Sequence, residues 1–104
     1  MDLNQYEEFR RSTEQYNLSL PKDVYAALGL VGEAGEVADK IKKQYRDSID
    51  VDDDIILELG DCLWYLCMLA NELNMSLEDI MERNVAKLKD RQKRGTIGGS
   101  GDHR

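Results

Sequence analysis

The chain has 104 residues, 41% of them hydrophobic and 34% charged, a length that corresponds to one compact domain. This composition is too apolar for a disordered chain and too charged for a membrane protein. The longest apolar run, residues 62–70, is far shorter than the roughly 20 residues of a membrane-spanning helix, so no membrane segment is expected. The N-terminus lacks the basic and apolar stretches of a signal peptide, which predicts a cytoplasmic protein.

The formal net charge of −7 is distributed unevenly along the chain. Residues 1–82 carry seven basic and nineteen acidic side chains, a sum of −12, whereas residues 83–104 carry seven basic and two acidic, a sum of +5. The acidic body disfavours a nucleic-acid polymer as partner, because phosphate contacts dominate that kind of binding. The basic segment suits either a small phosphorylated ligand or simply a solvated helix end.

Hydrophobic periodicity and the positions of proline and glycine predict four helices, at about residues 2–16, 22–46, 53–73 and 77–94. Pro21 suits the first turn of the second helix. The Asp52–Asp54 run suits the positive N-terminal end of the third helix better than a separate metal site. Ser76 followed by Asp79 predicts a capping box for the fourth. No strand-like alternation occurs, so the fold is predicted to be all-α.

Two of these helices predict how the core is built. The first has one face formed by Leu3, Tyr6, Phe9 and Thr13. The third is apolar around most of its circumference, through Leu57, Leu63, Trp64, Leu66, Cys67, Met68 and Leu69. Such a helix is buried all round, and three short neighbours cannot cover it within a chain of this size. We therefore predict a four-helix bundle that is completed by oligomerisation.

Residues 95–104 contain four glycines and no core-forming pattern. The chain is therefore predicted to divide into a helical domain, residues 1–94, and a flexible glycine-rich C-terminal tail, residues 95–104. Cys62 and Cys67 lie five residues apart in the apolar third helix. Their Cα atoms would be about 8 Å apart, beyond the reach of a disulfide, so we predict two buried thiols.

One short acidic pattern occurs twice, as Glu33-Ala-Gly-Glu36 in the second helix and as Glu58-Leu-Gly-Asp61 in the third. Acids three residues apart project from the same face of a helix. If the two helices pack side by side, four carboxylates converge. The glycine within each pair costs the helix about 1 kcal/mol relative to alanine, which favours the close approach of another helix or a ligand.

The chemistry of these side chains indicates a hard divalent cation. Carboxylate oxygens suit Mg²⁺ or Mn²⁺, and the single histidine, His103, lies in the tail, which disfavours zinc and a di-iron site. A carboxylate in an apolar helix costs several kcal/mol unless it is paired, protonated or bound to a cation. We therefore predict Glu33, Glu36, Glu58 and Asp61 as metal ligands; ordinary surface charge is the alternative.

Other polar side chains lie in register with these acids. Lys40 is two turns beyond Glu33 and is suited to a phosphate, or to solvent; Tyr65 is two turns beyond Glu58 and is suited to a base or sugar, or to the core. Trp64 is more typical of a core or interface position than of substrate stacking. The fourth helix presents one cationic face suited to a polyphosphate, formed by Asn84, Lys87, Arg91 and Arg94.

Three segments resemble the MazG-like, all-α nucleoside triphosphate pyrophosphohydrolases, and the resemblance covers about residues 25–94. They are Gly29-Leu-Val-Gly-Glu-Ala-Gly-Glu-Val-Ala38, Glu58-Leu-Gly-Asp-Cys-Leu-Trp-Tyr-Leu66 and Asn84-Val-Ala-Lys-Leu-Lys-Asp-Arg91. The family pattern is Glu-Glu-x-x-Glu followed by Glu-x-x-Asp, and Gly32 stands here in place of the first glutamate. The glycine-rich tail is similar to that of short, stand-alone bacterial and phage members, in which it could close over bound nucleotide.

The resemblance implies Mg²⁺-dependent hydrolysis of a nucleoside triphosphate to the monophosphate and pyrophosphate, with deoxynucleotides and non-standard nucleotides among the candidate substrates. The four acids would bind Mg²⁺, with Mn²⁺ as a substitute, and the expected substrate-binding residues are Lys40, Tyr65, Asn84, Lys87 and Arg91. The resemblance also implies a homotetramer or homodimer with active sites near subunit boundaries. The alternative is a non-catalytic helical module that binds nucleotide or only oligomerises, an alternative that the loss of the first motif glutamate keeps open.

Overall fold

The computed structural model describes residues 1–15 and 19–104, and in these ranges it contains four helices and no strand. They are α1 (Leu3–Ser12), α2 (Lys22–Asp47), α3 (Asp52–Glu72) and α4 (Leu77–Arg94). The all-α prediction is confirmed, and the bounds of the last three helices agree with the sequence to within one residue. The first helix ends at Ser12 instead of continuing to Tyr16, which lies outside the described residues together with Asn17 and Leu18.

Local sequence signals explain where the helices begin and end. Asp2 and Ser76 cap α1 and α4, each in a capping box with the side chain three residues on. Pro21 stands at the N-cap of α2, one residue before the first turn in which it was predicted. α2 ends where Ser48 adopts a left-handed conformation, φ 53°, and three aspartates occupy the first turn of α3, where the helix dipole favours negative charge.

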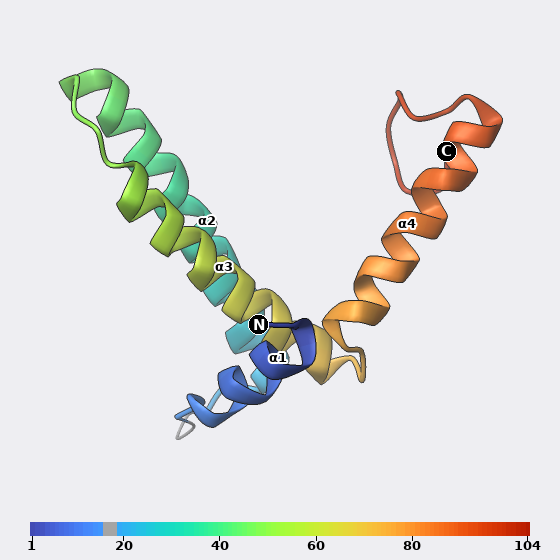
Figure 1. The fold of residues 1–104 in the computed structure, drawn as a ribbon, viewed down its shortest axis with the longest axis horizontal. Helices are drawn as coiled ribbons and strands as arrows, with labels where there is room; N and C mark the ends of the chain where they lie inside the picture. The colour runs from blue at the N-terminus through green and yellow to red at the C-terminus, as the bar shows by residue number, and fades with distance from the viewer. Residues whose placement is uncertain (16–18) are drawn as a thin grey trace.

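The helices form a hairpin with two attachments rather than a closed bundle. α2 and α3 run side by side along their lengths and make most of the contacts between helices (Figure 1). α1 lies across one end of this hairpin, and α4 leaves the same end and diverges from it (Figure 1). A bundle of four helices is therefore not completed within one chain.

The junction of α1, α3 and α4 is held by buried polar groups. Glu7 and Arg10 are 4% and 1% exposed. The Glu7 carboxylate accepts hydrogen bonds from the Leu77 backbone N–H at 3.0 Å and from the Asn71 side-chain amide at 3.2 Å. Arg10 donates to the Asn71 Oδ1 at 3.1 Å. The predicted apolar face of the first helix is wrong at Phe9, which is 63% exposed, because these hydrogen-bonded polar side chains take its place against α3.

The two thiols differ in their surroundings. Cys67 is fully buried in this junction, and burial raises the pKa of its thiol. Cys62 lies one and a half turns earlier on α3 and is only half-buried. Both are free cysteines. The prediction of two buried thiols is therefore confirmed for Cys67 and wrong for Cys62, because α3 is covered unevenly in a single chain.

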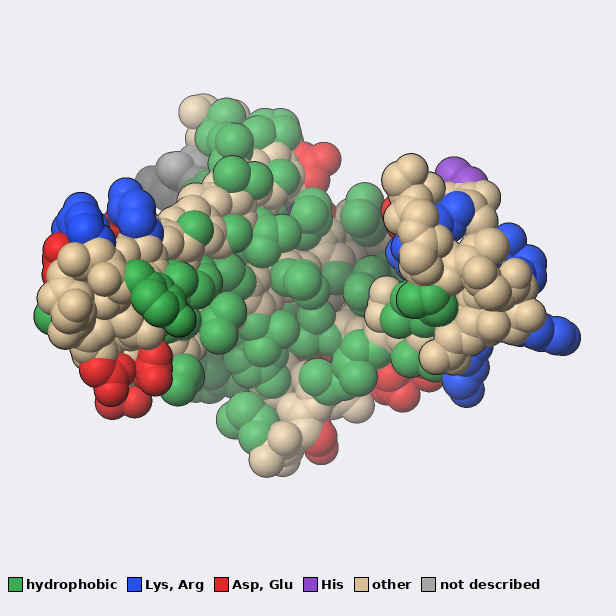
Figure 2. Space-filling model, turned by 90° about the horizontal axis from the view of Figure 1, so that it is seen from above, with side chains coloured by type: hydrophobic (Ala, Val, Ile, Leu, Met, Phe, Trp, Pro, Cys, Tyr) green, Lys and Arg blue, Asp and Glu red, His purple; other side chains and the backbone are tan. Residues whose placement is uncertain are grey.

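The chain exposes far more surface than a closed domain of its size. Its accessible surface is 7672 Å², against about 6,000 Å² expected for a folded monomer of this mass. Its radius of gyration is 16.6 Å, against about 13 Å for a compact domain of this length. Hydrophobic side chains cover a broad face between the α2–α3 hairpin and α4 (Figure 2).

The exposed hydrophobic side chains include two apolar stripes. On α3 the stripe is formed by Ile56, Leu59, Leu63 and Leu66, and on α4 by Met81, Val85 and Leu88. The spacing of each set places its members on one side of its helix. Among the described residues, no helix is long and apolar enough to cross a membrane.

Candidate active site

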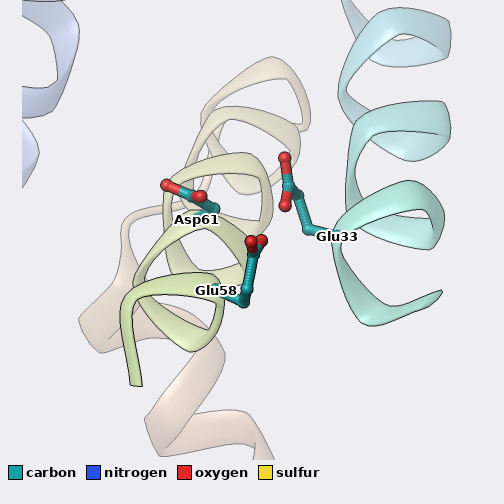
Figure 3. A group of neighbouring side chains, drawn as sticks. All are labelled: Glu33, Glu58 and Asp61. Atoms are coloured by element: carbon teal, nitrogen blue, oxygen red, sulfur yellow. The ribbon is translucent and has the colours of Figure 1, made fainter. Parts of the chain in front are cut away.

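Three acidic side chains from two neighbouring helices come together in the structure. Glu33 lies on α2, and Glu58 and Asp61 lie one turn apart on α3. One carboxylate oxygen of each lies within 4.8 Å of one from both of the others. The three carboxylates surround one small space, with Glu33 reaching across from α2 (Figure 3). The antiparallel packing of α2 on α3 thus brings the two acidic motifs together.

The electrostatics of this cluster show strong mutual repulsion. The pKa of Glu33 is raised to about 7, first by a hydrogen bond with the Glu58 carboxylate, then by burial and by the negative charges around it. Two carboxylates can share a hydrogen bond only while one of them keeps a proton. A divalent cation could replace that proton, and three carboxylates leave room for the waters that Mg²⁺ or Mn²⁺ retains. The donor set therefore fits such a cation.

The other two predicted residues of this region lie at the edge of the cluster. Glu36 is exposed and is absent from the group of three converging acids, although its charge contributes to the raised pKa of Glu33. The Lys40 Nζ lies 3.7 Å from a Glu58 carboxylate oxygen. Lys40 therefore partly neutralises the cluster and stands beside it, within reach of an anion bound there.

In chelator-treated protein, we expect thermal stability to fall as the pH rises from about 5 to 8. The folded-state pKa of Glu33, about 7, lies above its ordinary value of 4.5. Its proton therefore stabilises the fold fully below pH 4.5, and this contribution is lost as the pH rises through 7. The groups facing it are Glu58, Asp61 and Glu36. Glu33→Gln should flatten the profile, and melting temperatures across this range that fall equally in both proteins would contradict the prediction.

An open cavity of about 350 Å³ adjoins the acids. Glu33 and Asp61 line part of it. Its apolar lining comes from Tyr25, Trp64, Tyr65 and Met68, and polar side chains are supplied by Thr13, Glu14 and Gln15. Of these residues, Tyr65 was predicted as a substrate-binding residue, and the structure places it beside the acidic cluster.

The aromatic side chains of this cavity are held in a fixed arrangement. The Tyr65 ring stands edge-on to Tyr25 at 5.8 Å and to Trp64 at 5.0 Å between centroids. The Trp64 Nε1 donates to the Thr13 hydroxyl at 2.8 Å, and the Arg10 guanidinium lies over the indole, 5.1 Å from its centroid. A hydrogen bond with Tyr25, followed by burial, raises the pKa of Tyr65 to about 12. These contacting rings form an aromatic wall next to the carboxylates.

Gly29 explains how Tyr65 reaches this position. A Cβ at Gly29 would overlap the Tyr65 ring, so only glycine lets that ring pack against α2. At Gly32, Gly35 and Gly60 a Cβ would meet nothing within 4 Å among the described residues. The close helix approach expected at the glycines of the acidic motifs is therefore absent within one chain, and it occurs at Gly29 instead.

Gly29→Ala is expected to lower the free energy of unfolding by about 1–3 kcal/mol, because the ring of Tyr65 must move. The matched variant Gly32→Ala should raise it by up to about 1 kcal/mol, because alanine favours the helix and its methyl group meets no neighbour. Urea unfolding of both variants measures the difference. Equal effects at the two positions would show that the Gly29–Tyr65 contact is unimportant.

The predicted cationic residues of α4 lie apart from the acids. Asn84, Lys87 and Arg91 belong to the helix that diverges from the α2–α3 hairpin (Figure 1). Lys87 and Arg91 pair instead with Asp102 of the tail, at 3.1 and 3.4 Å. The structure therefore does not bring the cationic face and the carboxylates together within one chain.

Sequence reasoning missed several residues of the cavity. No sequence motif pointed to Tyr25 or Glu14, and Trp64 was predicted to be a core or interface residue. Trp64 is half-buried and lines the cavity. Gly29 offered a signal: it lies one turn after Tyr25, and a glycine there allows an aromatic ring from a neighbouring helix to pack closely.

Comparison with known proteins places the chain in a family. The sequence matches the MazG nucleotide pyrophosphohydrolase domain over residues 25–96, a range that includes the acidic cluster and all of α4. It is 49% identical over 85 residues to the "Gene 37 protein" of Mycobacterium phage L5, covering 77% of this chain and 75% of that protein. No solved structure matches the chain. Because the domain match spans more than half of its length, the chain belongs to the MazG nucleotide pyrophosphohydrolase family.

Proposed function

We propose that this protein hydrolyses nucleoside triphosphates to nucleoside monophosphate and pyrophosphate, with Mg²⁺ as the cofactor and Mn²⁺ as a substitute. The convergence of Glu33, Glu58 and Asp61 within 4.8 Å is the observation that carries the proposal. An aromatic-lined cavity beside these acids and the match to a nucleotide pyrophosphohydrolase domain support it. Glu36, one turn from Glu33, completes the proposed ligand set.

The acids and Lys40 have separate roles in this proposal. A bound divalent cation neutralises phosphate charge and lowers the pKa of water. The carboxylates would hold the cation to which the α-phosphate binds, and one of their oxygens accepts a proton from the attacking water as the oxygen of that water bonds to the α-phosphorus. The bond between the α-phosphorus and the bridging oxygen breaks, and pyrophosphate leaves. Lys40, held near the cluster by Glu58, supplies positive charge to the leaving phosphates.

The cavity is the proposed site of the nucleoside. Tyr65 and Trp64 offer aromatic faces to a base or sugar, and base–aromatic stacking tolerates every base. Glu14 and Gln15 supply hydrogen-bonding groups at the same cavity. The distance from this wall to the acids is short, since Glu33 and Asp61 line part of the same space. A nucleotide bound here would direct its phosphates to the carboxylates.

We propose that a second copy of the chain completes the site. The cationic residues Asn84, Lys87 and Arg91 lie on the diverging helix α4, away from the acids of their own chain (Figure 1). The uncovered apolar stripes of α3 and α4 favour self-association, as a homotetramer or a homodimer. In such an assembly, α4 of one copy can approach the carboxylates of another and contribute the charges that a polyphosphate needs.

A non-catalytic nucleotide-binding module is the second candidate function. The observation in its favour is Gly32, which replaces the first acid of the family motif and leaves open space beside the cluster. Pyrophosphate release from a panel of standard, deoxy- and modified triphosphates, with Mg²⁺ and with chelator, separates the two functions. We expect Mg²⁺-dependent release; nucleotide affinity without turnover would instead establish the binding module.

A further inference from the structure

The C-terminal tail, Gly95–Arg104, folds back along α4 (Figure 1). Gly95, Gly99 and Gly101 have φ values of 71°, 120° and 84°, in the left-handed region that glycine adopts without strain. The Arg104 guanidinium then closes the loop, because it donates to the backbone oxygens of Thr96 at 3.2 Å and of Ile97 at 3.0 Å, and to that of Gly101. The glycines and this arginine together set the path of the tail.

This path places a carboxylate of the tail on the cationic face of α4. The Asp102 Oδ1 accepts hydrogen bonds from the Lys87 Nζ at 3.1 Å and from the Arg91 Nη2 at 3.4 Å. The Gly101 backbone oxygen accepts a second bond from Arg91, at 3.2 Å. Arg91 is only 4% exposed, although α4 diverges from the rest of the molecule. The tail is therefore what buries Arg91.

Asp102 satisfies these two cations incompletely. One and the same oxygen serves both Lys87 and Arg91, and the Arg91 Nε is buried without a hydrogen-bond partner. A phosphate group carries more negative charge and three acceptor oxygens, and it can bind two nitrogens of one guanidinium at once. Asp102 itself is 76% exposed, so its ion pairs are screened by solvent. A phosphate group would therefore be the better ligand for the same cations.

We propose that Asp102 occupies the cationic site of Lys87 and Arg91 when no ligand is bound, and that a phosphate or pyrophosphate group displaces Asp102 and releases the tail. The proposal rests on the proposed function, which assigns these two cations to the phosphates of a nucleotide. Asp102 acts as an intramolecular competitor: its carboxylate keeps two cations paired in the free protein and leaves when the ligand arrives. The tail is therefore docked on α4 in the free protein and released when phosphate binds.

The test is a calorimetric titration of the full-length protein with inorganic pyrophosphate, in chelator and at fixed ionic strength. Without divalent cations the acidic cluster repels an anion, and the difference between the unaltered protein and Asp102→Asn isolates the contribution of the cationic site. Asp102→Asn should lower the dissociation constant of pyrophosphate by about threefold to tenfold. This is the effect expected when two solvent-screened ion pairs that compete with the ligand are lost. Asp47→Asn is the matched control, since Asp47 also pairs with an arginine, Arg46, but lies at the end of α2, and it should leave the constant unchanged.

An unchanged or weakened constant in Asp102→Asn would overturn the proposal and make the carboxylate a support for the site rather than its competitor. Hydrogen exchange of residues 95–104 gives an independent reading in the unaltered protein. Pyrophosphate should accelerate exchange in this segment, and added protection would contradict displacement. Both measurements are made without hydrolysis, so a chain that exchanges Asp102 for pyrophosphate but releases none from nucleotides would contradict the proposed function alone.

Discussion

Glu58→Gln and Asp61→Asn are each expected to reduce Mg²⁺-dependent pyrophosphate release by a factor of about 10²–10⁴. Each change removes one of the three converging carboxylates at nearly constant volume. The cation then loses a charged ligand, and the water near the α-phosphate loses a group that orients it. The measurement is the rate of pyrophosphate release at saturating Mg²⁺.

The fold should survive both substitutions. In the metal-free protein the acids repel one another, as the raised pKa of Glu33 shows, so removing one charge should leave the melting temperature unchanged or raise it. Asp39→Asn is the matched control, because Asp39 is an acid of the neighbouring helix α2 that pairs with Lys42 and Lys43; the activity of this variant should equal that of the unaltered protein. Full activity of Glu58→Gln, or undiminished turnover in chelator, would contradict a cation site at these acids.

The protein is expected to form a stable homo-oligomer at micromolar concentration. Its surface exceeds that of a compact monomer by about 1,700 Å², and a standard interface removes about 800 Å² from each partner. The apolar stripes of α3 and α4 are the surface that a second copy would cover. Leu59 and Val85, 52% and 48% exposed in one chain, lie within these stripes. Sedimentation or light scattering should therefore give a mass of two or four chains.

Leu59→Glu is expected to weaken this self-association by about 100-fold, because each copy in a symmetric pair loses about 1.5 kcal/mol of apolar burial and gains a charge. Val85→Glu should act in the same direction from α4. Tyr45→Glu is the control, since Tyr45 is 82% exposed near the far end of α2, outside both stripes. A folded and active species of 11.9 kDa would show that the apolar faces need no partner.

Local sequence rules account for the helices and for two of the three acids in the cluster. Capping residues determine the starts of α1 and α4, and three aspartates stabilise the first turn of α3, because these effects act within a few residues. The three-residue spacing of Glu58 and Asp61 likewise fixes their common face. To predict that Glu33 joins these two acids, it was enough to assume that consecutive helices joined by a short linker pack side by side. For this reason, the sequence was sufficient to predict the convergence of these acids.

Only the tertiary structure determined where the cavity lies, in which direction α4 runs and that the tail buries Arg91. The Trp64–Thr13 and Glu7–Leu77 hydrogen bonds join residues 51 and 70 positions apart, and helical periodicity carries no information about such pairs. It ranks side chains by polarity, so it placed Phe9 inside, whereas Glu7 and Arg10 are buried there with hydrogen-bond partners from other helices. The sequence by itself determined which helices form and that the two acidic motifs meet, but it also placed Glu36, which the structure leaves outside, in the cluster. Which surfaces stay open for nucleotide, tail or a second copy depended on long-range packing, because that is where buried polar groups find their partners.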